Sequence, residues 1–252
     1  MLLLDFSNAS YASQIDVKRE VKAWLSLARP EDRLALCALG NDGGFSVLHD
    51  FTADRALLAL ALEPYQPAPG APGFRDPTGD PLRLEDHIQT AVEALRGIAR
   101  HLGRLPGRKN LLWVSNFFPL PMPNRTVHAY SREFASALDE LNAADVAVYP
   151  LDPSGLHPPP SRSIPDAMPP EADRVVMEYL ADATGGRAFY DVNHFGAVLS
   201  ATASRSGVYS LSFYPDHGQW NGDFHQIQVR VARPGLQLRY RSGYTATPDP
   251  AR

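Results

Sequence analysis

Short apolar runs alternate with longer amphipathic segments through the first 205 residues, and this alternation restricts the possible fold more than any other feature. Uninterrupted apolar runs are typical of strands buried on both faces of a parallel sheet. They occur at residues 1–5, 33–39, 110–115 and 146–151, with a shorter run at 187–190. Because strands that alternate with helices form a parallel sheet covered on both faces, the sequence predicts a three-layer α/β/α sandwich with a mostly parallel central sheet.

Helical spacing of apolar residues marks the segments between these runs. The clearest is residues 84–102, where one stripe contains Ile88, Val92, Leu95, Ile98 and Leu102. Further helices are expected at residues 11–28, 55–62 (capped by Asp54), 131–143, 173–184 (ended by Gly185-Gly186) and 195–204. A turn at 41–44 predicts a hairpin strand at 45–49. Pro-rich stretches at 64–81 and 153–170 predict long surface loops.

From residue 207 the apolar period changes to two, which is typical of strands with one buried face. Strands are expected at residues 208–214, 224–231 and 236–240, with a hairpin turn at Pro234-Gly235. The chain is therefore divided into an α/β domain at 1–205, an antiparallel β unit at 206–246 and a tail at 247–252. Three strands with one apolar face are marginal alone, so we expect a further strand to pair with them. The abrupt start in a core strand predicts an upstream segment, which could carry a signal peptide.

Composition removes several classes of function. The net charge of -4 and the pI near 6.0 give no electrostatic basis for nucleic-acid binding. No stretch reaches the roughly 18 apolar residues of a transmembrane helix. The single cysteine, Cys37, excludes an intrachain disulfide and a multi-cysteine metal site. No Gly-rich phosphate loop and no Gly-x-Ser-x-Gly elbow is present, and no general base has an evident partner.

Polar residues follow three of the predicted core strands, where binding sites of parallel sheets collect. They are Asp5, Ser7 and Asn8 after the first strand, Ser115 and Asn116 after the fourth, and Asp152 after the fifth. One interpretation is that the acidic residues cap turns and helices. The other is that these loops form a binding site.

The segment Leu2-Leu3-Leu4-Asp5-Phe6-Ser7-Asn8-Ala9-Ser10 resembles the Asp-x-Ser-x-Ser loop of von Willebrand factor type A (VWA) domains. Residues 105–115, 141–142 with 146–152, 183–189 and 238–244 are similar to a bacterial VWFA-related branch first described from Acidobacteria. The resemblance implies a Rossmann-like fold that binds proteins or matrix through loops at the carboxyl ends of the strands. It also implies export to the periplasm or the cell exterior.

In VWA domains the loop Asp and both Ser hold a divalent cation. The resemblance therefore implies Mg2+ (or Mn2+/Ca2+) at Asp5 and Ser7, with Asn116 and Asp86 as weaker members and Thr90 as the next choice after Asp86. Two departures weaken this metal-ion-dependent adhesion site. Ala9 stands where the family has its second serine, and Asn116 stands where it has a carboxylate. We therefore expect a degenerate site.

The loop at residues 117–123 is apolar and rich in proline. If its side chains are exposed beside Asp5, they form a partner-binding patch that proline stiffens. The patch would consist of Phe117, Phe118, Leu120 and Met122. The alternative is that these side chains fold under and cover the end of the sheet.

The sequence favours a non-enzymatic module that binds a protein partner. Two alternatives stay open: a metal-assisted hydrolase that uses Asp5, Asp86 and Asp152, and a metal-free structural module of a larger exported protein. An aspartyl nucleophile at Asp5 is disfavoured because that chemistry needs a second Asp where Ser7 stands.

Overall fold

The computed structural model describes residues 1–9, 11–40, 44–66, 81–120, 131–156, 170–192, 194–203, 209, 211, 213, 220–236 and 238–246. Several predictions fall outside these ranges: most of the two long loops, the turn at 41–43, Met122, most of the strand at 208–214 and the tail at 247–252.

A five-stranded sheet forms the centre of the α/β domain, in the order β3-β2-β1-β4-β5. The strands are β1 (Leu2–Asp5), β2 (Leu34–Leu39), β3 (Phe45–Thr52), β4 (Lys109–Val114) and β5 (Val146–Leu151). All neighbours pair in parallel except β2 and β3, which form the expected antiparallel hairpin. Every residue of β1 and β5 is buried, as continuous apolar runs require, whereas the edge strand β3 is largely exposed.

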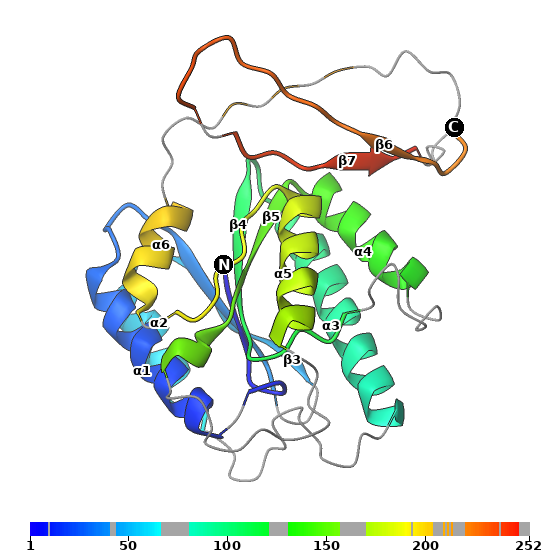
Figure 1. Cartoon of the computed structure of the whole chain (residues 1–252). Coiled ribbons are helices and arrows are strands. Elements are labelled where there is room, and N and C mark those ends of the chain that lie inside the picture. The colour runs from blue at the N-terminus through cyan, green and yellow to red at the C-terminus, as the bar shows by residue number, and fades with distance from the viewer. Residues whose placement is uncertain are drawn as a thin grey trace.

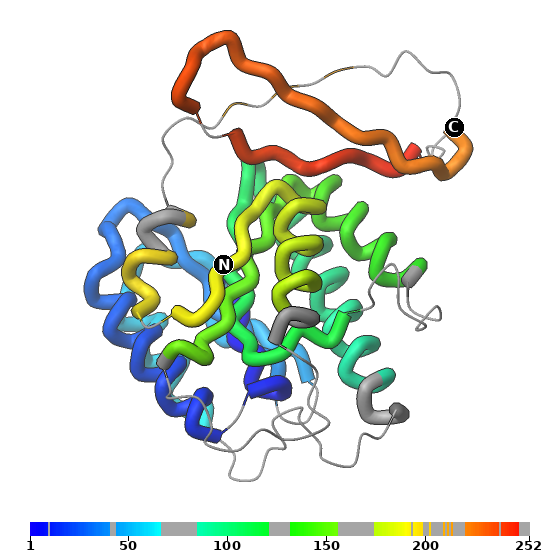
Figure 2. The backbone as a smooth tube through the Cα atoms, viewed as in Figure 1, coloured from blue at the N-terminus to red at the C-terminus, as the bar shows by residue number. Residues whose placement is uncertain are grey.

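Helices cover both faces of this sheet (Figures 1 and 2). On one face lie α1 (Tyr11–Leu27), α2 (Arg55–Leu62) and α6 (Phe195–Ala203); on the other lie α3 (Pro81–Leu102), α4 (Ser131–Ala143) and α5 (Pro170–Thr184). Asp54 caps α2 as predicted, accepting from the backbone N–H groups of Ala56 and Leu57. The three-layer α/β/α architecture is confirmed.

The period of two along β1 and β4 assigns side chains to the two cores. Leu3 and Trp113 pair in register and pack toward α3, α4 and α5. Leu2 and Leu4 point to the opposite core, toward α1 and α2. Asp5 has the same parity as Leu3, so its side chain lies on the α3 side of the sheet.

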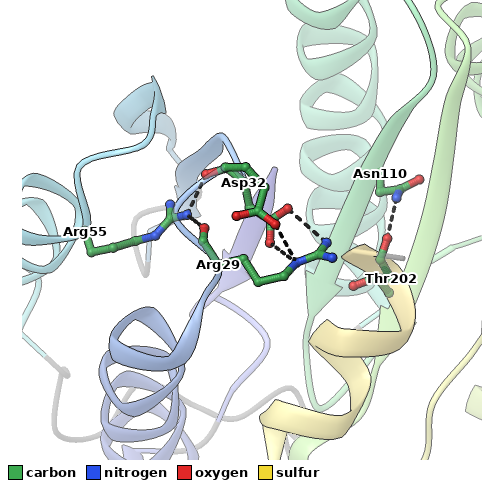
Figure 3. Close-up of polar contacts among 6 residues, drawn as sticks. Arg29, Asp32, Arg55, Asn110 and Thr202 are labelled. Carbon is green, nitrogen blue, oxygen red and sulfur yellow. Dashed lines mark hydrogen bonds and ion pairs between the residues drawn. The ribbon is translucent and has the colours of Figure 1, made fainter. Parts of the chain in front are cut away.

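Polar contacts fix the helices at the amino ends of the parallel strands (Figure 3). Arg29, just after α1, pairs with Asp32 through two contacts of 3.1 Å. Arg55 at the start of α2 donates to the backbone carbonyls of Arg29 and Asp32. On β4, the amide of Asn110 donates to the carbonyl oxygen of Thr202 over 2.6 Å and so joins α6 to the sheet.

Three expected strands differ from the structure. The segment at 187–190 contributes only a single parallel bridge, between Leu151 and Phe189. The C-terminal sheet has two strands, β6 (Phe224–Gln226) and β7 (Gly243–Thr245). The strand predicted at 224–231 therefore ends at residue 226, and the described residues of the strand predicted at 236–240 form no strand.

Gly243 explains this pairing register. A Cβ there would lie 2.2 Å from the Phe224 ring and 2.4 Å from the carbonyl oxygen of His225, so only glycine permits the close approach of the two strands. The predicted turn at Pro234-Gly235 is present, with Gly235 at a φ of 80°.

Candidate functional site

Asp5 ends β1 at the carboxyl edge of the sheet, and its carboxylate lies at the centre of a buried polar network. The side chain is 1% exposed, and hydrogen bonds to it come from the loops that follow both β1 and β4. Such a group is stable inside a protein only when its acceptor positions are filled.

The loop after β1 supplies the first donors. The hydroxyl of Ser7 donates to Oδ1 of Asp5 over 2.7 Å, and the backbone N–H of Asn8 donates to the same atom over 3.1 Å. The side-chain amide of Asn8 lies 3.1 Å from Oδ1 and 2.9 Å from Oδ2. The amide therefore lies against both oxygens of the carboxylate.

The neighbouring strand β4 supplies donors to the other oxygen. The indole N–H of Trp113 lies 3.2 Å from Oδ2 of Asp5, and the hydroxyl of Ser115 lies 3.1 Å from it. Ser115 is itself 1% exposed and lies 2.5 Å from the carbonyl oxygen of Phe117. The carboxylate thus joins the turn after β1 to the turn after β4.

Burial raises the pKa of Asp5, and hydrogen bonds from Asn8, Ser7, Trp113 and Ser115 act in the opposite direction. All four of these donors are neutral. Hydrogen bonds, not an ion pair, offset the cost of burying this carboxyl group.

A second polar group lies at the ends of β4 and β5. The hydroxyl and the backbone N–H of Ser154, in the short helix η2 (Pro153–Leu156), donate to Oδ1 of Asp152 over 2.5 and 2.9 Å. The Nδ2 atom of Asn116 lies 3.3 Å from the hydroxyl of Ser154, and its Oδ1 is buried without a partner in the described structure. Burial raises the pKa of Asp152.

Asp86 and His87 lie in α3, next to the Asp5 network. His87 reaches it: Nδ1 is 2.9 Å from Oδ1 of Asn8. Asp86 is exposed, and no contact joins it to Asp5 among the described residues. His87, not Asp86, therefore connects the central helix to the loop after β1.

The aromatic loop after β4 folds under the end of the sheet. Phe117, Phe118 and Leu120 are 7%, 1% and 6% exposed. The ring of Phe118 packs edge-on against Trp113, with centroids 5.1 Å apart. The predicted exposed patch is wrong for these three residues. Removing their apolar surface from water stabilises the fold, and they cover the core instead. Met122 lies outside the described residues.

The residues around Asp5 do not fit a closed divalent-metal site. A hard cation requires several oxygen ligands, usually with more than one carboxylate. Here the amide of Asn8 lies against both Asp5 oxygens, Asp86 faces solvent, and Asp152 is bound to Ser154. Among the described residues, no group of three His, Cys, Asp or Glu side chains could hold an ion. The assignment of Asp5, Ser7, Asn116 and Asp86 as metal ligands stays a prediction.

The fold is a Rossmann-like α/β sandwich with its polar site at the carboxyl ends of the strands. No family model matches the chain, and no curated protein matches it. Among solved structures, the conserved hypothetical protein BatB from Bacteroides thetaiotaomicron is similar, with 14% identity over 79% of this chain and 92% of that one and a TM-score of 0.49.

A second similar structure is an uncharacterized membrane spanning protein from Vibrio fischeri. It has 15% identity over 80% of this chain and 94% of that one, with a TM-score of 0.25. Similarities this weak indicate nothing about function. In the part of our chain that the structure describes, no helix has the length and apolar character to cross a bilayer.

Sequence reasoning located Asp5, Ser7, Asn8 and Ser115 at this edge but missed Trp113 and His87. Trp113 lies in the run at 110–115 that predicts a buried strand, and its parity with Ser115 places both on the Asp5 face. His87 directly precedes Ile88, the first residue of the buried helix stripe. This position beside the stripe is the sequence feature that could have indicated a contact with the sheet edge.

Proposed function

We propose that this chain is a non-enzymatic, VWA-like protein-binding module that contacts its partner at the carboxyl edge of the sheet, through exposed residues that border the loops after β1, β4 and β5. Asp5 acts as an internal anchor for these loops and works without a tightly bound cation. The resemblance to VWA domains supports the class of protein and also supports export, so partners are expected outside the cytoplasm.

One observation carries the proposal. The Asp5 carboxylate accepts from Ser7, Asn8, Trp113 and Ser115, so one buried group holds two loops in a fixed arrangement. Rigid loops lose little conformational entropy on binding a partner. The same hydrogen bonds occupy the oxygens that a metal would need.

The arrangement offers little support for catalysis. The hydroxyls of Ser7 and Ser115 lie against the Asp5 carboxylate but are only 9% and 1% exposed, so a substrate could not reach them in this arrangement of the loops. The alternative hydrolase would need Asp5, Asp86 and Asp152 to act together, but Asp5 and Asp152 belong to separate networks and Asp86 is exposed.

Residues that face solvent around the anchor provide the surface for contact. Tyr11 at the start of α1 is 45% exposed, and Asp86 and Ser154 are exposed on α3 and η2. They surround the loops that the Asp5 network holds. We assign them to the binding face in place of the buried aromatic loop.

Site-specific photo-crosslinking tests the binding face. A benzoylphenylalanine would replace Tyr11 or Asp86, and Leu60, exposed on α2, would be the control position. Cells of the source organism should yield the same discrete adduct from Tyr11 and Asp86 and none from Leu60. Equal labelling from all three positions, or adducts from Leu60 alone, would contradict the proposal.

Calorimetric titration of Mg2+, Mn2+ and Ca2+ into chelator-treated protein tests the metal-free anchor. We expect no saturable heat up to millimolar metal in the wild type. The double variant Ala9→Ser, Asn116→Asp, which restores the family's ligand types, should bind more tightly than the wild type. Saturable wild-type binding that Asp5→Ala abolishes would show that the site uses a metal after all.

A further inference from the structure

The C-terminal ribbon, residues 224–246, lies across the ends of β4, α4 and α5, at the edge of the sheet opposite Asp5 (Figure 1). It is anchored near β7. The backbone N–H of Ser242 donates to the carbonyl oxygen of Asp182 over 3.1 Å, and Asp139 of α4 accepts from the Thr245 side chain. This face is distant in the fold from the binding loops proposed above.

Most of the ribbon's described residues lie outside its strand ladder. Its strand ladder joins residues 224–226 to 243–245, and the last pairing bond runs from the N–H of Ile227 to the carbonyl oxygen of Ser242, at 2.9 Å. In the described ranges 228–236 and 238–241, no backbone hydrogen bond to the rest of the fold follows. Extended backbone without a partner strand is a template for strand addition.

Apolar side chains stand exposed along the same ribbon. The exposed fractions are 63% for Phe224, 47% for Val231, 52% for Leu236 and 40% for Leu238. Two-stranded ribbons are marginally stable alone. Side chains of this kind on an unpaired ribbon are typical of a surface that another strand covers.

The charge of the ribbon indicates the chemistry of that strand. Residues 224–246 include four arginines, at positions 230, 233, 239 and 241, and no aspartate or glutamate, although the whole chain has a net charge of -4. Arg230, Arg233 and Arg239 are exposed. A second copy of the ribbon would bring like charges together, which disfavours self-pairing. An acidic strand would have the complementary charge.

A groove of about 290 Å³ lies beside the ribbon and has room for a short part of such a strand. It runs between the end of α5 and the ribbon, and its lining includes Asp182, Gly186, Gln226, Leu238, Arg239 and Tyr240. Unpaired backbone at 238–240 and the Arg239 side chain therefore border the same space.

We propose that the C-terminal ribbon is a docking site for an extended acidic segment of another protein, which adds to it as a strand. The unpaired backbone binds the main chain of the partner, and Arg230, Arg233 and Arg239 bind its carboxylates. The exposed apolar side chains pack against apolar residues that alternate with those carboxylates.

The test measures fluorescence anisotropy of labelled ten-residue peptides added to the whole chain. The probe alternates Glu and Val. One control alternates Lys and Val, and a second alternates Glu and Pro, which keeps the charge but cannot pair as a strand because proline lacks the N–H donor. We expect binding of the Glu-Val peptide at least tenfold tighter than of either control, and weaker binding at high salt.

Charge reversal locates the site. Arg230→Glu with Arg239→Glu should weaken binding of the Glu-Val peptide at least tenfold, and Arg104→Glu, at an exposed position on another loop, should leave it unchanged. Equal binding of the Glu-Pro peptide would overturn strand addition. Binding to phosphatidylserine vesicles in place of the peptide, or a dimer that the double variant dissociates, would overturn the acidic-segment assignment. None of these results depends on the proposed carboxyl-edge binding face.

Discussion

The indole N–H of Trp113 donates to Oδ2 of Asp5 over 3.2 Å, from one strand of the central sheet to the next. The two residues have the same parity, and Leu3, two residues before Asp5, pairs in register with Trp113. A core residue thus supports the polar site directly. The stability of the sheet and the conformation of the loops therefore depend on the same contact, the hydrogen bond between Trp113 and Asp5.

Trp113→Phe tests this contact. Phenylalanine keeps an aromatic ring against Phe118 but removes the donor to Asp5, so a buried carboxylate oxygen loses one of its partners. We expect a loss of about 1–3 kcal/mol in the free energy of unfolding, measured by urea denaturation. Trp24→Phe is the control for lost ring volume, because Trp24 is also buried but its indole N–H makes no hydrogen bond to the described residues. Equal losses in the two variants would mean that the hydrogen bond adds nothing.

The raised pKa of Asp5 predicts a pH dependence with a defined sign. The folded protein holds this proton more tightly than the unfolded chain, whose carboxyl pKa is near 3.9. Protonation of Asp5 therefore stabilises the folded state as pH falls, and this contribution is lost as pH rises through the folded pKa. Asp5→Asn cannot titrate. The free energy of unfolding of the wild type minus that of Asp5→Asn should increase as the pH falls from 8 to the unfolded carboxyl pKa near 3.9. A flat or opposite trend over this range would contradict the assignment.

The sheet and its helices were predictable because each of their apolar patterns is compatible with only one kind of secondary structure. Continuous apolar runs such as Val146–Leu151 are stable only as strands covered on both faces, and the α3 stripe requires a helix packed on a core. The position of Asp5 followed from the same reasoning, since parallel strands bring their carboxyl ends to one edge.

Other features were not predictable from period alone. The loop containing Phe117 and Phe118 has no apolar periodicity, so the sequence allowed both an exposed patch and a buried loop. In the structure both side chains are buried, and the ring of Phe118 packs against Trp113. The last strands differ because pairing of Phe224 with Thr245 depends on the close approach at Gly243, a tertiary constraint that alternation does not encode.

His87 and Asn8 should be energetically coupled. Nδ1 of His87 lies 2.9 Å from the side-chain oxygen of Asn8, whose amide in turn lies against Asp5. A double-mutant cycle with His87→Ala and Asn8→Ala, followed by urea denaturation, should give a coupling energy of about 0.5–1.5 kcal/mol. Pairing His101→Ala with Asn8→Ala is the control, since His101 lies at the other end of α3 and contacts Asp50. A coupling energy no larger than that of the control would mean that His87 does not stabilise the Asp5 network through Asn8.

Gly186 should tolerate replacement poorly. A Cβ at this position would lie 1.8 Å from the carbonyl oxygen of Val148 and 2.7 Å from its carbonyl carbon, both in the backbone of β5. Because a buried strand has no room to move, we expect Gly186→Ala to lower the free energy of unfolding by about 3 kcal/mol or more.

The matched control is Gly196→Ala in α6, where a Cβ would meet nothing within 4 Å. Alanine is the better helix former, so this variant should raise stability by up to about 1 kcal/mol. Both effects would be read from urea denaturation midpoints at constant slope. A mild effect at Gly186 would mean that α5 and β5 can separate. The amide proton of Val148, which donates to the hydroxyl of Thr184 over 3.0 Å, should then exchange with solvent more rapidly than the other amide protons of β5.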